Sequence, residues 1–82
     1  MTAAELRELR KTWDLTQEEV AKRMALQRRA YIRLEMGDQL IRETHVLILE
    51  RISIDLAVET GELSYIIPRV RYIIDNLISL AE

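Results

Sequence analysis

The segment from Leu15 to Gly37, LTQEEVAKRMALQRRAYIRLEMG, constrains the fold most, because it carries start and stop signals for two short helices. Thr16 and Glu19 form a capping box, in which each side chain accepts a hydrogen bond from a backbone N–H near the start of the helix. Gln27 stands at the expected cap of the second helix, and Gly37 stands where a left-handed residue would end it. The segment therefore predicts two helices joined by a tight turn.

Three further helices are predicted outside this segment, which gives an all-α fold of five helices. Thr2 is the expected N-cap of a helix that ends near Lys11 and whose apolar residues repeat at helical spacing. Their stripe consists of Leu6, Leu9 and Trp13. A fourth helix is expected over about 43–58, where apolar residues point in every direction, so we expect it to be central and buried on all sides.

The fifth helix is expected to start after Ser64, its predicted cap, with Pro68 within its first turns. Its apolar residues form an arc of about 160°, whereas one packing face needs only about 100°. The excess predicts that one edge packs on the fourth helix and the other on a second copy of the chain. The predicted dimer interface comprises Ile66, Ile67, Val70, Ile73, Ile74, Leu77 and Ile78.

Length and charge suggest one small domain with two different halves. The chain has 82 residues, a size at which contacts with a partner often add needed stability. Residues 1–42 hold nine Lys or Arg against seven Asp or Glu, whereas residues 43–82 hold three against seven. The basic excess thus lies in the half with the two capped helices. No signal peptide or membrane-spanning run is evident, so we expect a cytoplasmic protein.

The helix after Gln27 carries the residues with the clearest chemistry. Projected at 100° per residue, Arg28, Arg29 and Arg33 fall on one arc together with Ile32. The guanidinium fork matches guanine O6 and N7 in the DNA major groove, and an apolar side chain can contact a thymine methyl. A run of charges is usually only a solvated face, but the caps and the turn around these arginines favour a DNA-binding role.

The sequence resembles a known family at these same positions. LRELRKTWDLTQEEVAKRM resembles the first two helices of the Cro/Xre-type helix-turn-helix regulators, and LQRRAYIRLEMG resembles their recognition helix. The resemblance extends from Leu6 to about Ile52. It implies a five-helix, repressor-like domain in which residues 1–42 bind DNA and residues 43–82 supply core and a C-terminal dimerisation helix. Ala25 replaces the family's common turn glycine, and we expect it to fit there without a positive φ.

The resemblance and the chemistry together give the candidate DNA contacts. The expected base-reading residues are Gln27, Arg28, Arg29, Ile32 and Arg33. The expected phosphate contacts are Gln17, Arg10, Lys11, Arg42 and Thr44, the last two because they precede or begin a helix whose free N–H groups suit a phosphate. The resemblance also implies a buried pair between Arg10 and Glu35.

These residues favour a homodimeric repressor that binds an inverted-repeat operator in double-stranded DNA, with autoregulation of its own operon as a further hypothesis. The alternative is an antitoxin-like interaction module whose C-terminal helices bind a partner protein such as a toxin. An enzyme is the weakest interpretation, because no nucleophile lies beside a base and only one histidine is present. We expect no cofactor, no metal site and no membrane association.

Overall fold

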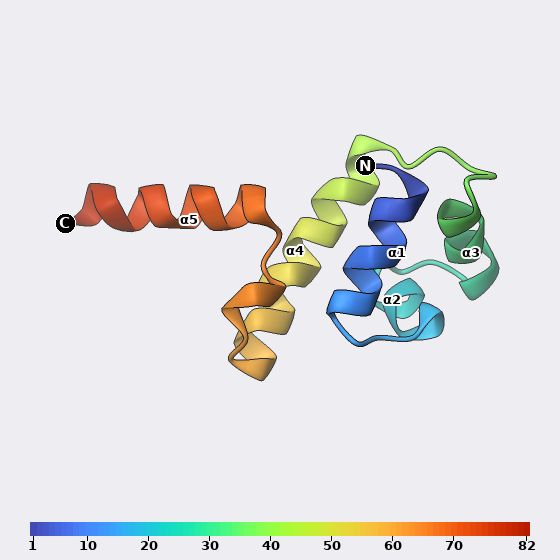
Figure 1. Ribbon diagram of the computed structural model, residues 1–82, viewed down its shortest axis with the longest axis horizontal. Coiled ribbons are helices and arrows are strands. Elements are labelled where there is room, and N and C mark those ends of the chain that lie inside the picture. Colours follow the sequence, from blue (N-terminus) through green and yellow to red (C-terminus); the bar gives the residue numbers. More distant parts are fainter.

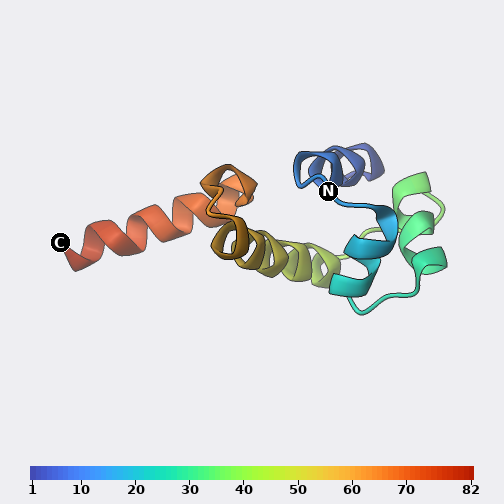
Figure 2. The ribbon, with the colours of Figure 1, turned by 90° about the horizontal axis from the view of Figure 1, so that it is seen from below.

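A computed structural model describes residues 1–82 as an all-α chain without β-strands, which confirms the all-α part of the predicted fold. The helices are α1 (Ala3–Thr12), α2 (Gln17–Arg23), α3 (Arg28–Met36), α4 (Glu43–Thr60) and α5 (Pro68–Ala81), with a short 3-10 helix, η1 (Leu63–Tyr65), between the last two. Helices α1 to α4 form a body from which α5 projects (Figures 1 and 2), and the molecule measures 45 × 23 × 19 Å. None of its helices is both long and apolar enough to cross a membrane.

The predicted N-caps of α1 and α2 and the predicted glycine end of α3 are present, whereas the Gln27 side chain makes no capping hydrogen bond at the start of α3. The Thr2 hydroxyl accepts the N–H of Glu5 at the start of α1, and the Thr16 hydroxyl accepts the N–H of Glu19 at the start of α2, both at 3.1 Å. In each case the glutamate accepts the N–H of the capping threonine in return. Gly37 ends α3 in the left-handed conformation, at a φ of 80°. Local sequence signals therefore define the first three helices.

The expectation for Ala25 was wrong, because this residue has a φ of 58°. Helix α2 ends with the N–H of Leu26 donating to the carbonyl of Ala21 at 2.8 Å. A bond of this span closes a helix end when the residue before the donor is left-handed. The turn thus imposes on alanine a conformation that costs an L-residue with a Cβ about 1–2 kcal/mol.

The core lies between α1, α2, α3 and one side of α4. Its largest fully buried apolar side chains are Tyr31, Leu6, Leu34, Leu49 and Val20. The Trp13 indole is also buried, and its Nε1 donates to the carbonyl of Tyr65 at 2.9 Å, which attaches η1 to the end of α1. The predicted stripe of α1 is confirmed, since Leu6 and Trp13 are buried and Leu9 packs against the core.

Helix α4 is not buried on all sides, contrary to the prediction. Leu49, Ile52 and Leu56 face the core, but the side chains of Leu47 and Val58 are exposed. Ile48 is exposed as well. The other elements cover only one side of α4, because α5 does not fold back over the opposite side (Figure 1).

The predicted start of the fifth helix and its packing along α4 were also wrong. Ser64 lies in η1, and α5 begins at Pro68. Ile66 and Ile67 between them are extended, as expected for residues that lead into a proline, which disfavours the helical region for the residue before it. This extended connector directs α5 away from α4 (Figure 1), so that only Val70 of α5 is buried.

Candidate nucleic-acid interface

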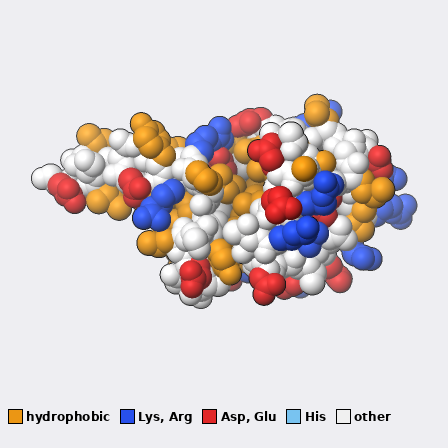
Figure 3. Space-filling model, in the orientation of Figure 1, with side chains coloured by type: hydrophobic (Ala, Val, Ile, Leu, Met, Phe, Trp, Pro, Cys, Tyr) orange, Lys and Arg blue, Asp and Glu red, His pale blue; other side chains and the backbone are white.

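Helix α3 presents a buried face and a basic face. Tyr31, Leu34 and Glu35 are buried against α1 and α2. Arg28, Arg29 and Arg33 are exposed, and they fall on the neighbouring arc projected from the sequence. Lys and Arg side chains gather at the end of the molecule where α3 lies, on the right in Figure 3.

The other two expected base-reading residues flank these arginines. Ile32 is partly exposed within the same helix. Gln27 is the N-cap residue of α3 and is exposed, but its side chain makes no capping hydrogen bond. Its amide is therefore free to bind an outside ligand. All five expected base-reading residues thus lie on or directly before α3.

The three arginines of α3 have no partner within the chain. None of them forms an ion pair or a side-chain hydrogen bond. This is so although the chain has more acidic than basic residues and a net charge of −2. Five other arginines do pair with carboxylates: Arg10, Arg23, Arg51, Arg69 and Arg71. The exposed arc of α3 is therefore a cluster of free guanidinium groups.

A buried carboxylate fixes this helix to its neighbours. Glu35 accepts from Arg10 Nε at 2.6 Å and Nη2 at 3.3 Å, from the Gln17 amide nitrogen at 2.7 Å, and from the Tyr31 hydroxyl at 2.9 Å. These donors come from α1, α2 and α3. The expected contact between Arg10 and Glu35 is present, and the network ties the three helices into one unit.

The network decides the charge state of its members. Burial opposes the charge of Glu35, but the hydrogen bonds from Arg10, Gln17 and Tyr31 outweigh it and lower the pKa of the carboxyl below its ordinary value. Burial, and then the neighbouring Glu35, raise the pKa of the Tyr31 hydroxyl. At neutral pH Glu35 is therefore ionised and the Tyr31 hydroxyl keeps its proton.

Two of the expected phosphate contacts point into this network. The Gln17 amide nitrogen donates to Glu35, and Arg10 uses Nη1 for the carbonyl of Leu15 at 3.2 Å in addition to its bonds with Glu35. Arg10 and Gln17 nevertheless line a polar hollow together with Thr16, Glu18 and Arg28. The structure thus brings two expected phosphate contacts beside the first base-reading arginine.

The other three expected phosphate contacts do not line this hollow. Lys11 is exposed at the end of α1, with its Nζ 3.8 Å from Glu8. Arg42 and Thr44 are exposed at the start of α4, where the Arg42 backbone N–H donates to His45 Nδ1 at 2.9 Å. The structure therefore does not gather all five expected phosphate contacts at one place.

The expected dimer residues divide into two groups. Ile66, Ile67 and Val70 are buried or partly buried in their own chain. Ile73, Leu77 and Ile78 are 50 to 61% exposed on the projecting part of α5, and Ile74 is partly exposed beside them. The second group has the larger exposed apolar surface.

Two contacts of the network were missed in the sequence. Tyr31 and Glu35 are one helical turn apart, a spacing that allows their contact and could have indicated it. The contact from Gln17 to Glu35 joins residues in different helices and has no local signal. Its prediction would have required the packing of α2 on α3.

Comparison with known proteins adds no further assignment. No protein-family model matches the chain, and no match is found among curated proteins or solved structures.

Proposed function

We propose that this protein is a sequence-specific transcription regulator that binds double-stranded DNA, with α2 and α3 as a helix-turn-helix motif. It acts as a homodimeric repressor, and α3 enters the major groove. The observation that carries the proposal is the cluster formed by Arg28, Arg29 and Arg33, which is exposed and unpaired. The carboxylates of Asp55, Glu50 and Asp75 pair with arginines outside this cluster, namely Arg51, Arg69 and Arg71.

The chemistry of the cluster suits base recognition. An arginine can donate two parallel hydrogen bonds to guanine O6 and N7, and each such contact discriminates against a wrong base by about 1–3 kcal/mol. Ile32, partly exposed between the arginines, suits a thymine methyl. The rigid attachment of α3 through Glu35 favours this role, because a recognition helix needs a fixed orientation.

The residues beside α3 suit the DNA backbone. The polar hollow of Arg10, Gln17 and Arg28 lies where α2 and α3 begin, and the proposed role of Gln17 and Arg10 there is to position the protein on a phosphate. Lys11, Arg42 and Thr44 are proposed as additional phosphate contacts. Such contacts set register and salt dependence, whereas the arginines of α3 set the sequence preference.

A homodimer would place two copies of α3 in successive major grooves about 34 Å apart. The operator is then an inverted repeat with half-site centres about 10 to 10.5 bp apart. Repression follows from occlusion of a promoter, with autoregulation of the protein's own operon as one form of it. A protein with this function works in the cytoplasm, with the DNA.

The test is selection of bound sequences from random duplex DNA by the purified protein. We expect an enriched inverted repeat, and we expect Arg29→Ala to weaken binding to it roughly tenfold to a hundredfold. Arg51→Ala is the matched control, because Arg51 is an exposed arginine of α4, away from α3, and should leave binding unchanged. The absence of any enriched sequence, with the fold intact, would contradict the proposal.

A second candidate is a protein-interaction module of the antitoxin kind. The exposed apolar face of α5, where Leu80 is 83% exposed, favours this candidate if the free protein is monomeric. Its mass in solution separates the two candidates, because a homodimer covers this face whereas a module awaiting a partner leaves it open.

A further inference from the structure

Helix α3 carries one large apolar side chain that the fold does not use. Met36, the last residue of this helix, is 67% exposed and does not pack against the core. The helix is ended by the backbone of Gly37, so the Met36 side chain has no part in the cap either. A single exposed apolar residue needs no explanation by itself, so its surroundings decide whether it has a role.

Met36 lies near the centre of the basic arc of α3. At 100° per residue, Arg28 and Arg33 are about 140° apart around the helix axis, and Ile32 and Met36 fall between them. Met36 is about 20° from Arg29, two turns earlier, and the buried residues of the helix fall on its other side. Ile32 and Met36 therefore form an apolar line with guanidinium groups on both sides of it.

The charges beside this apolar line indicate what covers it. The three arginines of the arc have no partner in the chain, and no acidic residue of α3 falls among them. An apolar protein surface laid over this line would bury guanidinium groups without a partner, which costs free energy. The DNA major groove instead offers acceptors to the arginines and the C5 methyl group of thymine to an apolar side chain. The surroundings of Met36 therefore favour DNA.

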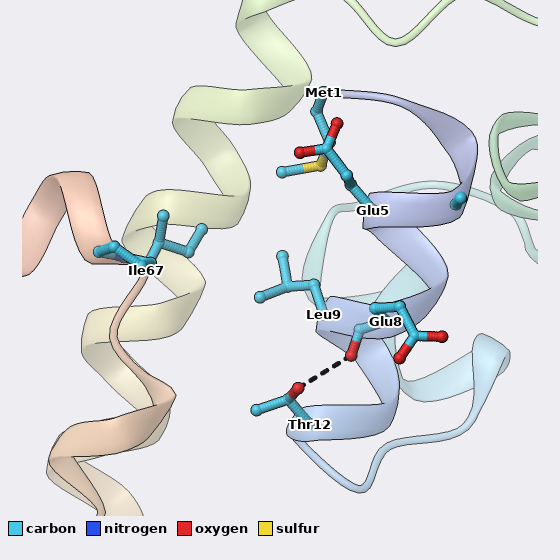
Figure 4. A pocket seen from close by; sticks show the side chains of 8 residues that line it. Met1, Glu5, Glu8, Leu9, Thr12 and Ile67 are labelled. Atoms are coloured by element: carbon cyan, nitrogen blue, oxygen red, sulfur yellow. Dashed lines mark hydrogen bonds between the residues drawn. The ribbon is translucent and has the colours of Figure 1, made fainter.

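The hollow between α1 and the connector to α5 has the opposite surroundings. Leu9 and Ile67 line it, but the acidic residues Glu5 and Glu8 line it as well (Figure 4). Carboxylates repel the phosphates of a nucleic acid. Apolar exposure alone therefore does not indicate a DNA contact, whereas apolar exposure among unpaired arginines does.

We infer that Met36 is a further base-reading residue, which contacts the C5 methyl group of a thymine in the major groove. The inference rests on the proposed function and names a chemical group that the operator must present. Base-reading side chains of known recognition helices span about seven positions, and Arg29 to Met36 has this span, about 10 Å along the axis. Ile32 and Met36 are one turn apart, a spacing at which groove-bound helices contact successive base pairs.

The test replaces thymine by uracil in the selected operator, one position of both half-sites at a time. Uracil keeps the base pair and removes only the C5 methyl group. At one position the wild-type protein should lose about fourfold in affinity for each methyl removed, the effect of one buried methyl group. Met36→Ala should bind the thymine operator more weakly and should show no further loss at that position.

Two variants serve as controls. Met36→Leu keeps a large apolar side chain and should retain the sensitivity to uracil. Val58→Ala removes an apolar side chain that is 80% exposed on α4, and it should bind the operator with the affinity and the uracil sensitivity of the wild type. Circular dichroism of each variant checks that the helices remain folded.

Several outcomes would overturn the inference. An operator without thymine would do so, and so would equal sensitivity of the wild type and Met36→Ala to uracil at every position; both leave the proposed function standing. A protein that selects no DNA sequence would contradict the proposed function and the inference together. If Met36→Ala instead changed the mass of the protein in solution and left DNA binding unchanged, Met36 would contact a protein surface and not DNA.

Discussion

The two regions of this molecule reach stability in different ways. In α1 to α3, every buried side-chain polar atom has a partner in the chain, and the buried charge of Glu35 receives bonds from three helices. In the region from α4 to α5, large apolar side chains such as Leu47, Leu77 and Leu80 face solvent. The first region buries its large apolar and charged groups within one chain, whereas the second leaves several large apolar side chains exposed.

The largest expected effect is on the first region, through Glu35→Ala. Removal of one member of a buried ion pair costs about 3–5 kcal/mol, and we expect the lower end because Arg10 is 18% exposed. Urea unfolding measures this loss, which should not depend on protein concentration if the network is internal to the chain. Glu62→Ala, an exposed glutamate without a partner, should change the free energy of unfolding little. Equal losses in both variants would contradict the role of the network.

The second region is tested by hydrogen exchange of the α5 amides. We expect fast exchange in dilute protein, because an unpartnered helix of this length opens readily. At protein concentrations about a hundredfold above the dimer dissociation constant, about 7% of the chains remain monomeric, so exchange should slow by roughly fifteenfold. Amides of α3 provide the internal control and should change far less. If the α5 amides are protected from exchange equally at all protein concentrations, the two regions do not differ in the way described.

A smaller effect is expected from Tyr31→Phe, which keeps the buried ring and removes the hydroxyl that donates to Glu35. A hydrogen bond to a charged group contributes about 1.5 kcal/mol or more, so stability at pH 7 should fall by about that amount. Tyr72→Phe is the matched control, because Tyr72 is 71% exposed. Urea unfolding at pH 7 measures both.

The loss of stability in Tyr31→Phe should depend on pH. Because the folded-state pKa of Glu35 is lowered, its contribution to stability is present above the unfolded value of about 4.3 and is lost as the pH falls below it. The pKa values of the capping glutamates Glu5 and Glu19 are also lowered, but these residues contribute equally to the stability of wild type and of Tyr31→Phe. The difference between wild type and Tyr31→Phe should therefore narrow below about pH 5. A constant difference would show that the hydroxyl does not respond to the charge of Glu35.

Much of the first region could be predicted from the sequence, because its signals are local. The capping boxes at Thr2 and Thr16, the glycine at position 37 and the two faces of α3 all depend on residues within a few positions of each other. The pair of Arg10 with Glu35 came from the family resemblance instead. The bond from Gln17 to Glu35 depends on packing between helices and was not predictable from spacing.

The second region was predicted less well for the same reason. A cap at Ser64 was as plausible locally as a start at Pro68, and the two extended isoleucines between them decide the direction of α5. Helical projection showed that the α5 arc is too wide for one packing face. It could not show which part of that arc the chain covers itself, because this depends on the path of the connector.

The single tryptophan stands at the junction of the two regions. Its indole Nε1 donates to the Tyr65 carbonyl, so η1 cannot leave α1 without exchanging this partner for water. Indole emission moves to longer wavelength when water reaches the ring. The chain therefore carries its own optical reporter, and one fluorescence signal can reveal whether the two regions separate before either of them unfolds.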